Sequence, residues 1–202
     1  MKKNVLGLLA KYPAPGIVKT RLAGDIGVKD AADVYRSIAE KVFKQTVPVG
    51  GSYERMVFYT PRSRRDDFEK WLPGERLRAQ NGTELGDIMA NALRDLLSDG
   101  AAKAVIAGVD IPDLGERVVR DAFAKLEDAD IVIGPAIDGG YYLIGMKALH
   151  DEIFRGISWS TDRVFHETIR IIDALGLSYS TVRTLSDVDR VADITNWGKL
   201  RS

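Results

Sequence analysis

The sequence predicts an α/β protein, in which one domain has a mostly parallel β-sheet flanked by helices. Short apolar runs alternate with amphipathic stretches along the chain, which is the pattern of strand–helix–strand units around a parallel sheet. The run at residues 5–10 contains no polar residue, as expected of a strand buried on both faces. With 202 residues, the chain is long enough for one well-buried core and short for two, so residues 1–202 are expected to form a single domain.

The individual elements follow from periodicity and turn residues. Strands are expected at residues 5–10, 56–60, 77–80, 104–108, 131–134, 141–146 and 179–184. Helices are expected between them, with Asp30, Thr83 and either Ser160 or Thr161 as caps, and one helix over residues 118–126. Gly100 supplies a left-handed stop for the helix after Thr83, and a terminal helix is expected after residue 189.

Composition excludes several classes of protein. Lysine plus arginine equals aspartate plus glutamate at 29 each, which argues against a nucleic-acid partner because such binders normally carry a basic excess. The absence of cysteine excludes disulfides, thiolate catalysis and zinc sites built on sulfur. The first apolar run is far shorter than the ~20 residues of a membrane span, and no signal-peptide cleavage pattern follows it. We therefore expect a cytoplasmic protein with no membrane association.

The segment after the first strand, residues 11–21, holds three cations (Lys11, Lys19 and Arg21) and no acid. Ligands of open α/β sheets bind beyond the carboxyl ends of the strands, where this loop lies. Gly16 allows close approach of the backbone to a ligand, and Lys19 and Arg21 can point the same way in an extended loop, towards one pyrophosphate. A solvated basic loop is the alternative. The glycine pattern matches neither a Rossmann fingerprint nor a P-loop.

A second candidate site follows the strand at 104–108. Asp110 is released at the end of this buried strand and Pro112 then turns the chain. Mg²⁺ binds to one or two carboxylates together with phosphate oxygens and water, so Asp110 is the candidate metal ligand. Asp113 fits a turn or a helix cap better.

A third segment, residues 134–145, reads GPAIDGGYYLIG. Asp138 is a candidate metal contact, substrate contact or general base, although a plain hairpin turn would also explain the paired glycines. Tyr141 and Tyr142 must point to opposite faces of the sheet, so at most one of them is expected to face a ligand. Asp187 and Asp189 either contact the metal or merely start the terminal helix. Trp159 begins the segment WSTD, which opens a helix whose N-terminus can receive a phosphate. Helix capping alone would also explain Ser160 or Thr161.

Taken in this order, the segments resemble the DUF2064 family. The resemblance is carried by KYPAPGIVKTRL, GVDIPDL, GPAIDGGYYLIG, ISWST and LSDVD, and it spans nearly the whole chain. Members are described as glycosyltransferase-like proteins with the GT-A, or nucleotide-diphospho-sugar transferase, fold. The family is also similar in outline to phospholactate and molybdenum-cofactor guanylyltransferases.

The resemblance implies that the loop after the first strand grips a nucleotide through Lys11, Gly16, Lys19 and Arg21. It also implies that Asp110 holds a divalent cation, Mg²⁺ or Mn²⁺. Asp110 stands in D-I-P and not in the D-x-D of many metal-dependent glycosyltransferases, which leans towards the nucleotidyltransferase branch. The implied partners are a nucleotide or nucleotide sugar and a small-molecule acceptor, and the sequence is compatible with a homodimer.

We therefore expect an Mg²⁺-dependent, glycosyltransferase-like enzyme that transfers a sugar from a nucleotide sugar to a small acceptor. Its expected catalytic residues are Asp138 and Lys19, and the expected substrate contacts are Gly139, Gly140, Tyr142 and Trp159. One alternative is a nucleotidyltransferase that joins an NTP to a phosphorylated small molecule and releases pyrophosphate. Another is a nucleotide-binding module without catalysis.

Overall fold

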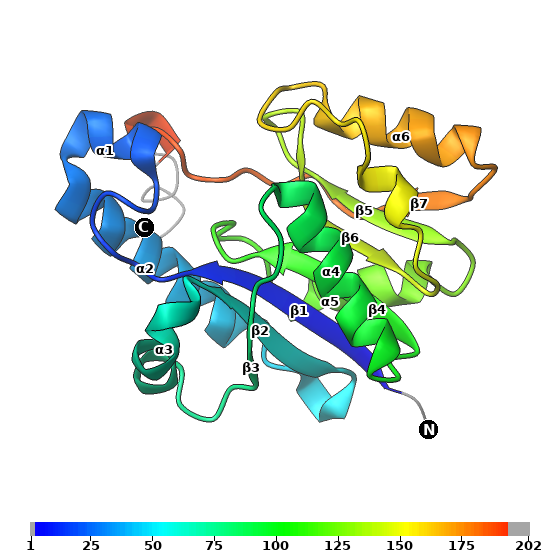
Figure 1. Ribbon diagram of the computed structural model, residues 1–202, viewed down its shortest axis with the longest axis horizontal. Coiled ribbons are helices and arrows are strands. Elements are labelled where there is room, and N and C mark those ends of the chain that lie inside the picture. Colours follow the sequence, from blue (N-terminus) through cyan, green and yellow to red (C-terminus); the bar gives the residue numbers. More distant parts are fainter. Residues whose placement is uncertain (1–2, 194–202) are drawn as a thin grey trace.

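A computed structural model describes residues 3–193, which form one sheet with helices on both of its faces (Figure 1). Its strands are β1 (Asn4–Lys11), β2 (Glu54–Thr60), β3 (Leu77–Ala79), β4 (Lys103–Gly108), β5 (Ile131–Pro135), β6 (Tyr141–Met146) and β7 (Tyr179–Thr181). Its α-helices are α1 (Thr20–Ile26), α2 (Val28–Gln45), α3 (Arg65–Trp71), α4 (Leu85–Ser98), α5 (Glu116–Lys125) and α6 (Val164–Ala174). Short 3₁₀ helices cover Val49–Gly51, Arg62–Arg64 and Asp151–Phe154.

The seven strands form one sheet in the order β3-β2-β1-β4-β6-β5-β7. All neighbouring strands are parallel except that β6 runs antiparallel to both β4 and β5. The predicted α/β class and mostly parallel sheet are therefore confirmed.

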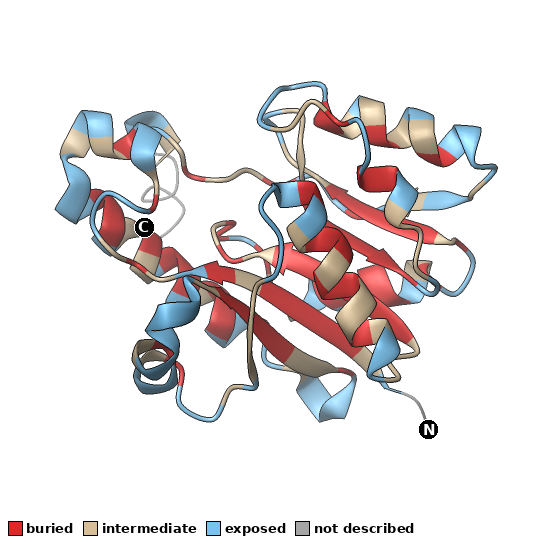
Figure 2. Ribbon diagram, in the orientation of Figure 1, coloured by how far each residue is buried: buried red, intermediate tan, exposed pale blue. Residues whose placement is uncertain are grey.

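Both faces of the central strands are covered, which explains the uninterrupted apolar run in β1. Leu6 and Leu8 pack into the core beneath α2, α3 and α5, whereas Val5 and Leu9 pack into the core beneath α4 and α6. Figure 2 shows the central strands as almost wholly buried between these helices. Successive side chains of a strand point to opposite faces, so a strand covered twice needs apolar residues at every position.

The winding of the chain opens a crevice at one edge of this sheet. From β1 the chain passes through α1 and α2 to β2 on one side, whereas β4 pairs with the other side of β1. Helices on the two sides diverge at such a switch point, and ligands of open α/β sheets bind there, beyond the carboxyl ends of the strands. In this sheet β1 ends at Lys11 and β4 ends at Gly108, two residues before Asp110.

The predicted helix caps were wrong. The helix α2 begins at Val28, so Asp30 lies within its first turn, and α4 has Glu84 rather than Thr83 at its N-cap. Neither helix has a side-chain cap hydrogen bond. By contrast, Gly100 follows α4 with a φ of 96°, which confirms its role as a left-handed stop.

The start of α6 also differs from the prediction. This helix begins at Val164, beyond the expected caps Ser160 and Thr161. The Thr161 hydroxyl donates a 2.7 Å hydrogen bond to the Ser158 carbonyl, so it closes a turn of the preceding loop. Residues 191–193 are helical, and the rest of the expected terminal helix lies outside the described residues. No helix within residues 3–193 is long and apolar enough to cross a membrane.

Candidate functional site

A cavity of about 890 Å³ lies at the switch point. Its walls come from the ends of β1 and β4, the first turns of α1 and α4, the turn between β5 and β6, and the loop before α6. The last described segment of the chain contributes Asp187 and Asp189. Because β6 runs antiparallel, its first residues lie at the same edge as the last residues of β4.

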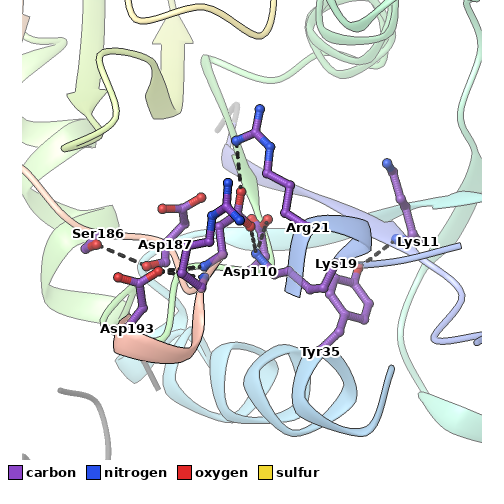
Figure 3. A network of polar contacts seen from close by, with 10 residues as sticks. Lys11, Lys19, Arg21, Tyr35, Asp110, Ser186, Asp187 and Asp193 are labelled. Carbon is purple, nitrogen blue, oxygen red and sulfur yellow. Dashed lines mark hydrogen bonds and ion pairs between the residues drawn. The ribbon is translucent and has the colours of Figure 1, made fainter. Parts of the chain in front are cut away.

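Three charged residues from distant parts of the sequence meet in this cavity (Figure 3). The Lys19 ammonium nitrogen lies 3.0 Å from Oδ2 of Asp110 and 3.0 Å from Oδ1 of Asp189. The Lys19 side chain is only 4% exposed. Burial opposes its charge, but the attraction of the two carboxylates outweighs burial and raises the pKa of Lys19. Lys19 therefore stays protonated beside Asp110, the predicted metal ligand.

The segment that carries Lys19 is not the extended loop that the sequence predicted. Lys19 has a left-handed backbone (φ 47°) and immediately precedes α1, so Arg21 lies inside a helix. Arg21 nevertheless reaches Asp189, with 3.4 Å between Nη1 and Oδ2. Within residues 3–193, Lys19 and Ser160 (φ 64°) are the only non-glycine residues with a positive φ, and both line the cavity. Such conformations cost of order 1–3 kcal/mol and cluster at functional sites.

The Asp187 carboxyl group lies near three other carboxylates of the cavity. Burial raises its pKa to about 6, with further contributions from Asp189, Asp110 and Asp138, whereas Lys19 acts in the opposite direction. Within residues 3–193, the structure contains no group of three or more histidine, cysteine, aspartate or glutamate side chains that could hold a metal ion by themselves. The chemistry of the donors nevertheless fits a cation that is held by one or two carboxylates and by the phosphates of a ligand.

Replacing Asp187 by asparagine is expected to stabilise the ligand-free protein at about pH 8 and to have little effect at about pH 3. The raised pKa means that ionised Asp187 destabilises the fold above pH 6. This penalty disappears as the pH falls below the pKa of an unfolded aspartate, because the carboxyl group is then protonated in both states. Asp187 is partly exposed, so after allowance for solvent screening we expect a gain of about 1 kcal/mol at the higher pH.

Thermal unfolding of the two proteins without divalent cations measures this difference. Asp173→Asn, which removes an exposed carboxylate on α6, is the matched control. An equal stabilisation at both pH values would contradict the electrostatic explanation.

The other predicted nucleotide contacts are placed unequally. Lys11 ends β1 and lines the cavity, and its backbone N–H donates a 2.9 Å hydrogen bond to the Tyr35 hydroxyl. Tyr35 also lines the cavity, and burial, with Asp110 nearby, raises the pKa of its hydroxyl. Sequence reasoning missed Tyr35, because a tyrosine at helical spacing gives the same signal as any core residue. Gly16 has a left-handed φ of 79° but lies in an exposed turn, outside the cavity lining.

The predicted substrate contacts in the β5–β6 turn have different surroundings. Asp138 is exposed at the cavity, and its Oδ1 accepts a 2.9 Å hydrogen bond from the N–H of Gly140, which also lines the cavity. Gly139 has a φ of 89° and packs against the backbone of Asp162, with which a Cβ at this position would collide. Gly139 therefore allows close contact between the β5–β6 turn and the loop before α6, and it does not line the cavity.

The two tyrosines of β6 point to opposite faces, as predicted. Tyr142 lies in the core beneath α5, and Tyr141 packs against the core beneath α4 and α6. The Tyr142 ring borders the cavity, but the residue is only 6% exposed and its hydroxyl donates a 2.8 Å hydrogen bond to the Arg183 carbonyl. Burial also raises the pKa of this hydroxyl, so it stays protonated.

Trp159 lines the cavity beside the first turn of α4. Its indole lies against Gly86, where a Cβ would be 2.9 Å from Cζ2 of the ring. The Tyr141 and Trp159 rings are 6.4 Å apart between centroids and nearly perpendicular. Gly86 therefore provides the space that Trp159 occupies, which no sequence motif indicated.

Comparisons with known proteins identify the family of the chain and its fold. Residues 45–161 match the model of the DUF2064 family, described as uncharacterized proteins conserved in bacteria. The chain belongs to this family. It is 31% identical, with a TM-score of 0.93, to a candidate nucleotide-diphospho-sugar transferase from Desulfovibrio desulfuricans G20, over 100% of this chain and 89% of that chain.

More distant structures share the fold of this DUF2064 member. A nucleotidyl transferase from Methanothermobacter is 15% identical, with a TM-score of 0.66 over 100% of this chain and 99% of that chain. A Mycobacterium tuberculosis H37Rv protein solved as a complex with manganese is 12% identical, with a TM-score of 0.54 over 96% and 97% of the two chains. The search of curated proteins found no match.

Proposed function

We propose that this DUF2064 member is a nucleotide-dependent transferase, and that it transfers a sugar from a nucleotide sugar to a hydroxyl group of a small acceptor. The observation that carries the proposal is the buried Lys19 ammonium, held 3.0 Å from both Asp110 and Asp189 at the switch point. Lys19, with Arg21 and Lys11 on the same wall, provides the charge that a diphosphate needs. The Desulfovibrio relative, described as a candidate nucleotide-diphospho-sugar transferase, supports this assignment.

The residues present also fit a divalent cation. Among the described residues, three cations and five carboxylates line the cavity, namely Lys11, Lys19 and Arg21 against Asp110, Asp138, Asp162, Asp187 and Asp189. Asp110, with Asp187 or Asp189, would hold Mg²⁺ or Mn²⁺, and the bound cation would stabilise negative charge on the phosphate oxygens. Lys19 can leave its carboxylates for a phosphate most easily when a cation replaces its charge there. We therefore expect the nucleotide and the cation to bind cooperatively.

The transfer step requires one proton to be removed. The acceptor oxygen forms a bond to the sugar carbon, the bond from that carbon to the phosphate oxygen breaks, and the electron pair leaves with the nucleoside diphosphate. The acceptor proton passes to Asp138, whose exposed carboxylate uses only Oδ1 within the turn. Lys19 and Arg21 offset the charge that develops on the leaving phosphate.

Nucleotidyl transfer is the second candidate. The Methanothermobacter neighbour is described as a nucleotidyl transferase, and Asp110 stands in D-I-P without a second carboxylate beside it. In this reaction an acceptor phosphate would attack the α-phosphorus of an NTP, with no base required, and pyrophosphate would leave. Because the other reaction releases a nucleoside diphosphate, phosphorus NMR of the products distinguishes the two candidates.

Substitution of Lys19 and Arg21 tests the proposed nucleotide site itself. Lys19→Ala and Arg21→Ala should each weaken binding of nucleoside di- and triphosphates far more than binding of the bare nucleoside. A charge-assisted hydrogen bond contributes about 1.5–3 kcal/mol, which is roughly tenfold to over a hundredfold in affinity. Calorimetry after a thermal-shift screen of nucleotides and nucleotide sugars, with and without Mg²⁺, measures this difference.

Lys29→Ala removes an exposed cation of α2 that does not line the cavity, so it serves as the matched control. Equal losses for the nucleoside and the triphosphate in the Lys19 and Arg21 variants would show that this wall acts by shape and does not bind phosphates.

A further inference from the structure

The described cations that line the cavity all lie on one wall, where Asp110 and Asp189 pair with two of them, whereas two further lining carboxylates lie on another wall. Within residues 3–193, the lining cations are Lys11, Lys19 and Arg21, and all of them come from residues 11–21. The wall formed by the β5–β6 turn and by the loop before α6 carries Asp138 and Asp162 and, within the described residues, no lining cation. Figure 1 shows the segment between β1 and α1 and the loop before α6 on opposite sides of the first turn of α4.

The carboxylates of the second wall have no cationic partner in the part of the chain that the structure describes. Asp138 accepts a hydrogen bond only from the backbone of Gly140, and the exposed Asp162 side chain has no ion pair. Arg163 is next in the chain, but it pairs with Glu167 at 3.7 Å and does not line the cavity. The first turn of α4 carries its own acid, Asp87, which offsets the positive end of the helix.

The same wall presents an apolar surface. Trp159 lies against Gly86 and Tyr141, and Leu85 and Ile88 of α4 line the cavity beside it. Leu85 is 47% exposed and so offers apolar surface to a ligand in the cavity. Indole and leucine side chains here can bury an apolar face of a small molecule.

The loop that carries Trp159 is held in place by its own hydrogen bonds. Both the backbone N–H and the hydroxyl of Ser158 donate to the Glu167 carboxylate, at 2.7 and 3.2 Å. Thr161 closes the turn onto the Ser158 carbonyl. The left-handed Ser160 lies inside this turn. The wall is therefore preformed and does not need a ligand to assemble it.

From this arrangement we propose the chemical class of the acceptor: a hydroxyl compound that carries no phosphate or carboxylate group and that has an apolar face to lie against Trp159. The inference rests on the proposed function, because it assumes that the nucleotide phosphates occupy the basic wall. An anionic acceptor would meet two unpaired carboxylates with no cation to offset them, and such like-charge contacts select against a ligand. An uncharged or cationic acceptor meets no such barrier.

The experiment measures binding of matched probes to protein that is saturated with Mg²⁺ and with the nucleoside diphosphate that binds most tightly. The probes are phenyl β-D-glucoside and phenethyl alcohol, each paired with its phosphate monoester. We expect the unphosphorylated member of each pair to bind at least about tenfold more tightly by calorimetry. Trp159→Ala should weaken the unphosphorylated member.

Charge reversal provides the matched comparison. Asp162→Lys should shift the ratio of the two affinities by about tenfold towards the phosphate monoester. Asp173→Lys makes the same charge change on the exposed surface of α6, outside the cavity, and should leave the ratio unchanged.

A phosphate monoester that binds wild-type protein as tightly as its partner would overturn the proposal, and so would nucleotide-loaded protein that binds neither member. If the nucleotide itself fails to bind in an Mg²⁺-dependent way, the proposed function fails before the acceptor is tested. The two failures are thus distinguishable.

Discussion

Asp138→Asn is expected to slow sugar transfer by roughly 10²–10⁴-fold, the usual contribution of a general base, while the nucleotide donor still binds. The carboxylate is exposed at the cavity and accepts a single backbone hydrogen bond, which an asparagine oxygen can also accept. The substitution therefore removes the basic oxygen and leaves the turn intact. The turnover number and the donor dissociation constant, measured on the same preparation, separate the two effects.

Asp173→Asn on α6 is the control for this variant and should keep full turnover. If the enzyme is a nucleotidyltransferase, Asp138→Asn should act mainly through acceptor or metal affinity, because an anionic acceptor needs no base. Pyrophosphate formed from an NTP, with no nucleoside diphosphate released from any nucleotide sugar, would refute sugar transfer.

Asp110→Asn should abolish the Mg²⁺-dependent part of nucleotide affinity without unfolding the protein. We expect a loss of more than about a hundredfold, since even residues that only orient metal ligands typically contribute 10–100-fold. An amide is nearly the same shape as the carboxylate but lacks the charge that a hard cation needs. Lys19 keeps its second partner, Asp189, so its buried charge remains paired.

Calorimetry with and without Mg²⁺, on protein whose fold is verified by thermal unfolding, measures the effect. Asp113→Asn is the matched control, because Asp113 lies three residues further along and its carboxylate faces Lys41 at 3.7 Å, away from the cavity lining. Unchanged Mg²⁺-dependent affinity in folded Asp110→Asn would exclude Asp110 as the metal ligand.

The ion pairs of Lys19 couple charged residues that are far apart in the sequence. Without a ligand, Lys19 offsets the charges of Asp110 and Asp189, which come from the end of β4 and from the last described segment of the chain. In the proposed function Lys19 binds the phosphates of the nucleotide, whereas Asp110, with Asp187 or Asp189, holds the cation. A substitution at one of them changes the charge balance of all three, so double variants are expected to show non-additive effects.

The sequence by itself determined the sheet and much of the polar crevice. Apolar runs placed the strands to within a few residues because a strand covered on both faces tolerates few polar residues, as in β1 and β4. The end of a strand can also be predicted from the neighbouring residues, and this placed Asp110 beyond the carboxyl end of β4. The period of two put Tyr141 and Tyr142 on opposite faces.

Only the tertiary structure decided how the site is assembled. The left-handed backbone of Lys19, the helix that follows it and the ion pair to Asp189, 170 positions along the chain, have no local sequence signal. The contact of Trp159 with Gly86 is likewise invisible in the sequence. Local propensity fixes where elements form, whereas these contacts depend on which elements the fold places side by side. The placement of the lining cations on one wall, and of Asp138, Asp162 and Trp159 on the other, therefore becomes visible only in the folded protein.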